Sequence, residues 1–401
     1  MSTFITNARI FDGEHVRSER TVEIRAGEIV SLGRAPSGDA EIVDGNGGTL
    51  LPGLIDGHVH TSLDGLRLAR VFGVTTELEM QGYWTPLQRK EIDADDDLAD
   101  VRSALLGLMA DGGHPRQFID DLDEHPAGAG WAPPSVSTPD EAVAHVRAMV
   151  AQGADYIKVM IEEGTVLGHP GLPLIDVDSL RAGVAEAHRL GKQVIAHAMT
   201  LAATWQAVEV GVDGLAHLFI DLPHTDEIVS ALVAADIFVT PCLVVSNSVM
   251  GGSGRELADD PRVSSRLPEP WLAALRGSFD KYRAGDLDVV LASVAALHEA
   301  GVDIIAGTDA SIPLPSHGGV AHGASIHHEL QLLVAAGLTP IDALRAATSV
   351  PAKRFGLDDR GRIAPGARAD LVLVDGDPTT RIDDSLSLRA VWRRGTPHFE
   401  K

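Results

Sequence analysis

His58 and His60 are the first residues of the chain whose types and spacing could bind a metal ion. They stand in LIDGHVH, where the apolar residues before the pair predict a buried strand. Side chains two positions apart on a strand point to the same face, so both imidazoles can reach one ion. By itself the pair carries little weight, because the chain contains 17 histidines.

Three more metal-capable side chains each close a predicted strand. His197 closes KQVIAHA, His217 closes VDGLAHL and Asp309 closes VDIIAGTD. In a parallel barrel all strands end at one rim, so residues far apart in sequence meet there. Each residue alone could be a hydrogen-bonded rim residue, but their joint placement favours a metal site. Because Cys242 is the only cysteine, we expect nitrogen and oxygen ligands.

Lys158 lies inside YIKVMI, a predicted fourth strand with apolar residues on both sides. Lysine is rarely buried unless it is paired. Burial and nearby cations would lower its pKa toward a neutral amine, which can capture carbon dioxide as a carbamate. The two carbamate oxygens could bridge two metal ions about 3.5 to 4 Å apart. The alternative is a lysine that extends to the rim or pairs with Glu162.

The elements that must position these residues alternate between helix and strand. From residue 54 to 356, Ala-rich amphipathic segments such as SLRAGVAEAHRLG are each followed by a short β-branched run. This pattern is typical of a parallel sheet with crossover helices. Eight candidate strands favour an α/β fold of the closed (β/α)8 TIM barrel type over an open sheet.

Both ends of the chain predict short antiparallel strands separated by turns. Residues 1–53 show this pattern, and residues 357–401 repeat it after the helical region ends near Phe355. We expect the two ends to meet in one sheet and to form a small β-sandwich domain beside the barrel. The stretch from Ser246 to about Trp271 is polar and rich in Gly and Pro, which predicts a loop over the barrel mouth.

The composition argues against several classes of function. Acidic residues outnumber basic ones 57 to 33, and the net charge of −24 repels nucleic-acid phosphates and anionic lipid surfaces. No apolar stretch is long enough to cross a membrane, and the first residues lack the pattern of a signal peptide. We therefore expect a cytoplasmic protein that acts on a small molecule, without a nucleic-acid or membrane partner.

The residues described above resemble the metal centre of the amidohydrolase superfamily. The resemblance implies two divalent metal ions, with zinc expected because imidazole and carboxylate ligands accept it readily. The metal ligands would be His58, His60, Lys158 carrying a carboxylate from carbon dioxide, His197, His217 and Asp309. The segments LLPGLIDGHVH and GRIAPGARADLVLVDGDP are also similar to that superfamily's barrel entry and returning β-sandwich, so the resemblance covers nearly the whole chain.

Within the superfamily, the order GADYIKVM, KQVIAHA, GVDGLAHL is similar to one branch. That branch holds Xaa-Pro dipeptidase-like, arginine carboxypeptidase-like and ochratoxin-hydrolysing enzymes. Met199 stands where many of these relatives have Tyr, and Glu162, Glu163 and Gly164 stand in place of a Ser-Gly-Gly segment. These departures argue against dipeptide substrates. Related enzymes often assemble as homo-oligomers, so a homo-oligomer is a possible state of this chain.

The reaction that the resemblance implies is hydrolysis of an amide or peptide-like C–N bond. A hydroxide bridging the two metal ions would attack the carbonyl, and Asp309 would pass the proton to the leaving nitrogen. His114 in DGGHP follows the third strand, resembles a Gly-Gly-His segment of relatives and is the candidate donor to the oxyanion. Apolar loop segments after the fourth and seventh strands favour a partly hydrophobic substrate.

Two alternatives remain open at this point. A deaminase or cyclic-amide hydrolase with one metal ion would need no bridging lysine, so Lys158 disfavours it. A non-catalytic scaffold with the same fold would not need six ligands. Several residues near strand ends have no assigned role: Glu79, Gln81, His169, His317 and His322.

Overall fold

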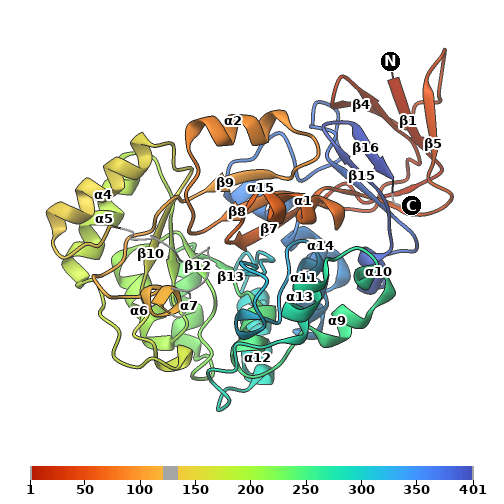
Figure 1. The fold of residues 1–401 in the computed structure, drawn as a ribbon. Helices are drawn as coiled ribbons and strands as arrows, with labels where there is room; N and C mark the ends of the chain where they lie inside the picture. Colours follow the sequence, from red (N-terminus) through yellow and green to blue (C-terminus); the bar gives the residue numbers. More distant parts are fainter. Residues whose placement is uncertain (1, 121–133, 400–401) are drawn as a thin grey trace.

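The computed structural model describes residues 2–120 and 134–399 (Figure 1). The strands are β1 (Ser2–Thr6), β2 (Arg9–Ile10), β3 (Val22–Arg25), β4 (Glu28–Leu32), β5 (Glu41–Asp44), β6 (Thr49–Pro52), β7 (Leu54–Val59), β8 (Val74–Glu79), β9 (Asp100–Ser103), β10 (Ile157–Met160), β11 (Val194–His197), β12 (Gly214–Ala216), β13 (Phe238–Thr240), β14 (Leu371–Val374), β15 (Leu388–Arg393) and β16 (Thr396–Phe399).

The helices connect and cover these strands. They are α1 (Leu63–Val71), α2 (Pro86–Ala94), α3 (Arg116–Asp120), α4 (Pro139–Ala151), α5 (Val177–Arg189), α6 (Leu201–Val210), α7 (Asp226–Ala234), α8 (Leu243–Val249), α9 (Arg255–Asp259), α10 (Pro261–Ser264), α11 (Glu269–Arg276), α12 (Leu287–Glu299), α13 (Ala324–Ala335), α14 (Pro340–Ala346) and α15 (Ser349–Arg354). Short 3-10 helices are η1 (Thr165–Leu167), η2 (Pro315–His317) and η3 (Ile382–Leu386). None of the helices in the described part of the chain is long and apolar enough to span a membrane.

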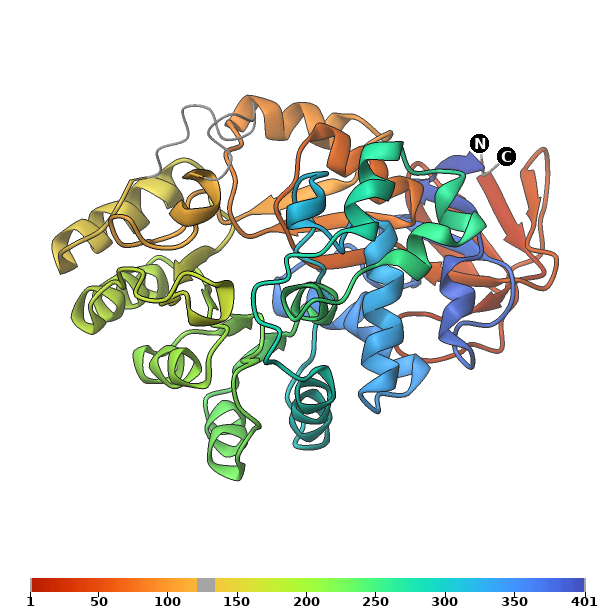
Figure 2. The same ribbon diagram turned by 60° about the horizontal axis from the view of Figure 1, so that its bottom comes forward.

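The strands of the central region run parallel in two groups. One sheet has the order β7-β8-β9 and the other has the order β10-β11-β12-β13. An isolated bridge between Leu108 and Val159 links the two groups. Figure 2 shows the helices arranged around these strands. The region therefore has the predicted α/β composition of a TIM-barrel fold.

The predicted eighth strand differs from the expectation. The segment 304–310 makes isolated bridges to β13 and to β7 rather than a continuous strand. The backbone N–H of Thr308 is shared between the Asp56 carboxylate at 3.0 Å and the His58 carbonyl of β7 at 3.2 Å. The N–H of Asp309 donates to the same carbonyl at 2.8 Å, so the regular ladder with β7 is broken here. Asp309 then has a φ of 56°, which lies outside the strand region. A side chain and a left-handed residue interrupt the strand where it reaches the rim.

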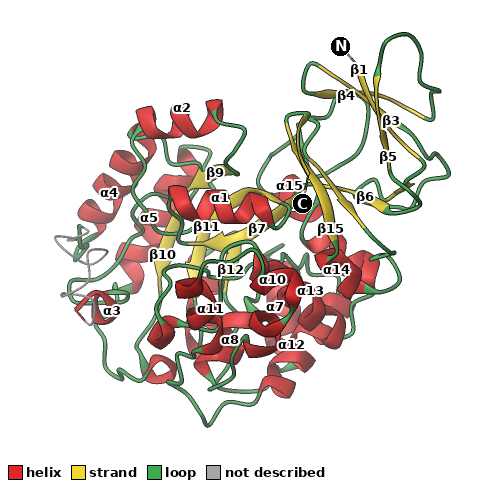
Figure 3. Cartoon of the chain, turned by 45° about the vertical axis from the view of Figure 1, so that its right-hand side comes forward, coloured by secondary structure: helices red, strands yellow, loops and turns green. Residues whose placement is uncertain are grey.

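Strands from both ends of the chain form one five-stranded sheet with the order β16-β15-β14-β6-β2. Strand β14 pairs antiparallel with β6, so that Leu371 lies opposite Pro52. A second sheet, β4-β3-β1-β5, comes from the amino-terminal residues. Ile24 from the second sheet and Trp392 from the first belong to the same buried apolar cluster. Figure 3 shows these strands beside the helix-rich region, and the predicted meeting of the two ends in one sheet is confirmed.

The stretch predicted as a loop, from Ser246 to about Trp271, is mostly helical. It contains the end of α8, all of α9 and α10 and the start of α11. Helix α10 begins at a local cap, because the Asp260 carboxylate accepts the N–H of Arg262 at 2.8 Å. Such short helices, separated by Gly and Pro, are too short to show a helical repeat of apolar residues, so the sequence pattern predicted a loop.

Candidate metal centre

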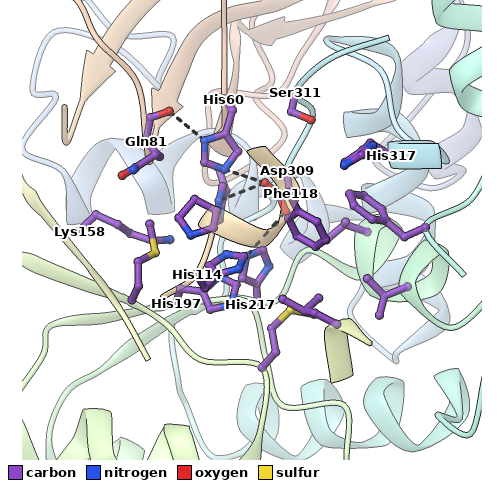
Figure 4. A pocket seen from close by; sticks show the side chains of 18 of the residues that line it. His60, Gln81, His114, Phe118, Lys158, His197, His217, Asp309, Ser311 and His317 are labelled. Carbon is purple, nitrogen blue, oxygen red and sulfur yellow. Dashed lines mark hydrogen bonds and ion pairs between the residues drawn. The ribbon is translucent and has the colours of Figure 1, made fainter. Parts of the chain in front are cut away.

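The carboxyl ends of the barrel strands bring the six predicted metal ligands to one cavity (Figure 4). The cavity has a volume of about 240 Å³. His58 lies on β7 and His60 directly follows it, Lys158 lies on β10 and His197 ends β11. His217 directly follows β12, and Asp309 lies in the segment at the position of the eighth strand. The ligands that line the cavity are His58, His60, Lys158, His197, His217 and Asp309.

Asp309 lies among three of the histidines. Its Oδ1 is 3.1 Å from Nε2 of His60 and 3.4 Å from Nε2 of His58. Its Oδ2 is 3.8 Å from Nε2 of His217. Ligand atoms at about 2.0–2.2 Å from one zinc ion in tetrahedral geometry lie about 3.4 Å from each other. The distances around Asp309 therefore suit side chains that share an ion.

Several buried nitrogen atoms of the cavity have no hydrogen-bond partner in the described structure. They are Nδ1 and Nε2 of His58, Nδ1 of His217 and Nζ of Lys158. An unsatisfied buried polar atom destabilises a fold by about 1–3 kcal/mol, so such atoms need an explanation. A divalent cation would bind imidazole nitrogens of this kind, and the residues present fit that group.

The protonation of three of the four histidines also fits metal binding. Burial lowers the pKa of His58, His197 and His217 well below its usual value. Burial also opposes the charged form of His60. The hydrogen bond to Asp309 and the negative charge of Asp309 outweigh burial and raise the pKa of His60. A neutral imidazole has the free lone pair that a metal ion requires.

Lys158 is completely buried, and burial lowers its pKa to about 7. A substantial fraction of the amine is therefore neutral near pH 7, as carbamate formation requires. No ion pair joins Lys158 to Glu162 among the described contacts. Glu162 instead lies with Oε2 at 3.2 Å from Nε2 of His197, and its Oε1 accepts the N–H of Gly164 at 2.7 Å.

The sequence analysis did not place Glu162 and Cys242 beside the histidines of this site. Glu162 contacts His197, and Cys242 is buried with its Sγ within 4.8 Å of ligand atoms of His58 and His217. Cys242 closes the seventh strand segment DIFVTPC just as the predicted ligands close theirs, and that position could have identified it. We expected only nitrogen and oxygen ligands, but the thiol of Cys242 lies close to His58 and His217.

His114, the predicted oxyanion donor, lines the same cavity. The centroid of its ring is 4.3 Å from that of His197. The side-chain amide of Gln117 donates from Nε2 to Nδ1 of His114 at 2.8 Å, which leaves the proton of a neutral ring on Nε2. Burial lowers the pKa of His114 well below its usual value, so the ring is neutral. His114 thus offers one N–H donor at the cavity wall.

Among the residues without an assigned role, Gln81 and His317 line the cavity. The backbone carbonyl of Gln81 lies 3.0 Å from Nδ1 of His60 and fixes the orientation of that ring. His169 is not among the lining residues, and its ring centroid lies 6.3 Å from that of Phe118.

The other two residues belong to the surroundings of the site. His322 is completely buried, with Nδ1 at 2.9 Å from Oε1 of Glu77 and Nε2 at 3.2 Å from the Ser311 carbonyl. Glu79 accepts a hydrogen bond from Oγ of Ser103 at 2.6 Å. Neither His322 nor Glu79 lines the cavity.

Comparison with known proteins identifies the family. Residues 49–398 match the amidohydrolase family. The chain belongs to the amidohydrolase family. The predicted superfamily is thereby confirmed, and membership makes the chain a hydrolase that acts on C–N bonds in a family that generally uses divalent metals.

Individual relatives agree with this assignment. An uncharacterized protein of Mycobacterium tuberculosis (strain ATCC 25618 / H37Rv) is 27% identical over 348 residues, which cover 83% of this chain and 80% of that protein. The crystal structure of a Xaa-Pro dipeptidase with bound methionine in the active site is 22% identical, covers 100% of both chains and has a TM-score of 0.74. The ochratoxinase of A. niger is 22% identical with a TM-score of 0.72, covering 98% of this chain and 94% of that chain. The last two likenesses show a shared fold.

Proposed function

We propose that this amidohydrolase uses two divalent metal ions, preferably zinc, to hydrolyse an amide or peptide-like C–N bond of a small, partly hydrophobic substrate. The observation that carries the proposal is the convergence of six ligand-type side chains on one cavity. The four histidines and Asp309 would hold the ions, and Lys158 would contribute as a carbamate. Its Nζ forms a bond to the carbon of carbon dioxide and releases one proton to solvent. Bound divalent ions would polarise the scissile carbonyl and generate hydroxide at neutral pH.

Asp309 holds and moves the proton. Burial opposes its charge, but the hydrogen bond from His60 and the charges around it lower its pKa, so the carboxylate is ionised at neutral pH. We assign Oδ2 as the atom that takes the proton of the attacking water, because Oδ1 is closer to His60. The same atom then delivers the proton to the leaving nitrogen. The Nε2–H of His114 would donate to the oxyanion that forms on the carbonyl.

The same proposal includes a closed barrel of residues 54–356 and a β-sandwich domain of residues 1–53 and 357–401. Bridges between the two parallel groups and on both sides of segment 304–310 support closure of the barrel. The buried cluster shared by the two terminal sheets supports the sandwich.

Metal-loaded enzyme and a panel of amides, carbamates and cyclic amides test this function. We expect turnover by the wild type and a loss of several orders of magnitude in His58→Ala and Asp309→Ala, with the circular dichroism unchanged. Bicarbonate should speed recovery of metal and activity in metal-depleted wild type but not in Lys158→Ala, whereas the exposed control Lys90→Ala should behave as the wild type. Inactivity across the panel would refute the function. One ion per chain, unaffected by Lys158→Ala, would favour the mononuclear alternative.

A further inference from the structure

The cavity continues beyond the metal ligands into an apolar part. Its walls come from four parts of the chain, which follow β9, β10, β13 and the segment 304–310. The side chains there include Phe118, Leu167, Val245, Val249, Phe279 and Ile312. A substrate bound at the metal centre must place one of its two halves against this surface.

Three rings of this part pack against one another. The centroids of Phe118 and Phe279 are 5.7 Å apart, and His317 lies 5.5 Å from Phe118 and 5.2 Å from Phe279. His114 joins this cluster to the metal centre, because its ring is 5.7 Å from Phe118 and 4.3 Å from His197. Figure 4 shows Phe118 and His317 on one side of the cavity and Lys158 on the other. These rings form an apolar wall against which a flat or branched apolar group can pack.

The apolar part offers no cation to a charged substrate. Among the described residues that line the cavity there is no arginine, and the single lysine is Lys158 at the metal centre. A carboxylate placed in such surroundings loses its hydration without gaining an ion-pair partner, which is strongly unfavourable.

We propose that the apolar part binds the acyl half of the substrate, that it selects acyl groups that are uncharged and aromatic or branched aliphatic, and that it rejects a carboxylate there. This inference rests on the proposed function. A hydrolase that accepts a carboxylate on the acyl group needs a cation or an array of donors at that place. The net charge of −24 adds a long-range bias against anions.

A pair of substrates of equal size tests the inference. Isohexanoyl and succinyl nitroanilides have the same leaving group and nearly the same shape, and only the second carries a carboxylate. We expect the metal-loaded wild type to hydrolyse the isohexanoyl compound with a kcat/KM about 100-fold higher, as for a buried group without a partner. The phenylpropanoyl nitroanilide should be at least as good a substrate. Equal or better hydrolysis of the succinyl compound would overturn the inference and leave the proposed hydrolase intact.

Variants of one wall residue supply the control. Phe279→Arg places a cation in the apolar part and should reduce the preference for the isohexanoyl compound by about tenfold or more, because the carboxylate then gains a partner. Phe279→Leu keeps the wall apolar and should retain the preference. An unchanged ratio in a folded Phe279→Arg variant would contradict the placement of the substrate.

Binding measurements keep the inference testable without turnover. Isohexanoyl and succinyl hydroxamates share a metal-binding group and differ only in the acyl group. Calorimetry with the metal-loaded protein therefore compares how the two acyl groups affect affinity. Tighter binding of the isohexanoyl hydroxamate by an enzyme that hydrolyses none of the anilides would support the inference about the ligand and count against the proposed reaction. Tighter binding of the succinyl compound would overturn the inference whatever the activity.

Discussion

His114 and Asp309 line the same cavity and differ in charge at neutral pH: His114 is neutral and Asp309 is ionised. Burial lowers the pKa of His114 and keeps the ring neutral, whereas the contact with His60 lowers the pKa of Asp309 against the effect of burial and keeps it ionised. One cavity thus holds a hydrogen-bond donor without charge and a proton acceptor. This division of roles is what acyl transfer from an amide requires.

Replacing His114 by phenylalanine removes the Nε2–H donor but keeps a ring against His197 and Phe118. We expect kcat to fall by about 10²–10³-fold with a smaller change in KM, because the donor acts on the oxyanion rather than on the bound substrate. Steady-state kinetics at constant metal content measure both. His169→Phe, at a position outside the cavity, should leave both constants unchanged. A normal kcat in His114→Phe would remove His114 from the mechanism.

At the scale of elements, the strand ends carry unusual backbone. His217, Cys242 and Asp309 have φ values of 73°, 50° and 56°. His217 and Cys242 follow β12 and β13, and Asp309 lies in the irregular eighth segment. Such conformations in residues other than glycine cost about 1–3 kcal/mol each and persist where packing enforces them. The barrel therefore holds these side chains in place at some expense of stability.

Helix α8 depends on another helix for its first hydrogen bonds. Its N-cap, Cys242, provides no side-chain acceptor. Glu329 on α13 takes that role, with Oε1 at 3.0 Å from the Leu243 nitrogen and Oε2 at 2.9 Å from the Val244 nitrogen. Since α8 also carries Val245 of the cavity wall, the contact couples two helices to the shape of the site.

Glu329 predicts a pH dependence of stability. Burial raises its pKa to about 8 from the ordinary 4.5, although the α8 amides lower it. Between these values the folded protein holds a proton that the unfolded chain has released, so stability falls as pH rises through this range. Glu329→Gln cannot titrate, and its free energy of unfolding should fall less between about pH 5 and 8.

Urea unfolding at several pH values measures how the free energy of unfolding of each protein changes with pH. Glu91→Gln, at an exposed position, controls for the loss of a carboxylate. The Glu91→Gln curve should run parallel to that of the wild type. If the Glu329→Gln curve were parallel as well, Glu329 would not change protonation on folding.

At the scale of the whole molecule, a buried ion cluster joins the carboxyl-terminal residues to the barrel. Asp100 at the start of β9 bonds to Arg360 and lies 3.4 Å from Nη1 of Arg368. Arg360 also donates to Oγ1 of Thr76 on β8 at 3.1 Å. Asp100 and Arg360 are 2% and 4% exposed. The cluster lies at the amino ends of these strands, opposite the cavity, where a barrel enzyme places residues for stability.

Arg360→Met should lower the free energy of unfolding by about 3–5 kcal/mol, because it leaves a buried carboxylate without its main partner. Burial raises the pKa of Asp100, but Arg360 and the neighbouring arginines outweigh burial and lower it. The stabilisation is therefore complete at neutral pH and is lost in acid below the ordinary value of 3.8.

Urea unfolding at neutral and acidic pH should show the largest difference between wild type and Arg360→Met at neutral pH. Arg181→Met, which removes the exposed ion pairs with Asp178 and Glu209, should cost less than about 1 kcal/mol. The kcat of folded Arg360→Met should be normal. A lower kcat with unchanged stability would place the effect of Arg360 at the active site instead.

The family, the α/β alternation and the set of ligand types could be predicted from the sequence, because each depends on local order: an apolar run, then a residue able to bind metal, then a helix. His58, Lys158 and His217 could be selected in this way without knowledge of their neighbours. The other side chains that share the cavity with these ligands could be found only from the tertiary structure. Phe118, Phe279 and His317 come from three separate segments, and no spacing in the sequence relates them. The irregular eighth strand and the short helices after Ser246 depend on contacts with distant residues, which a local pattern of apolar residues does not contain.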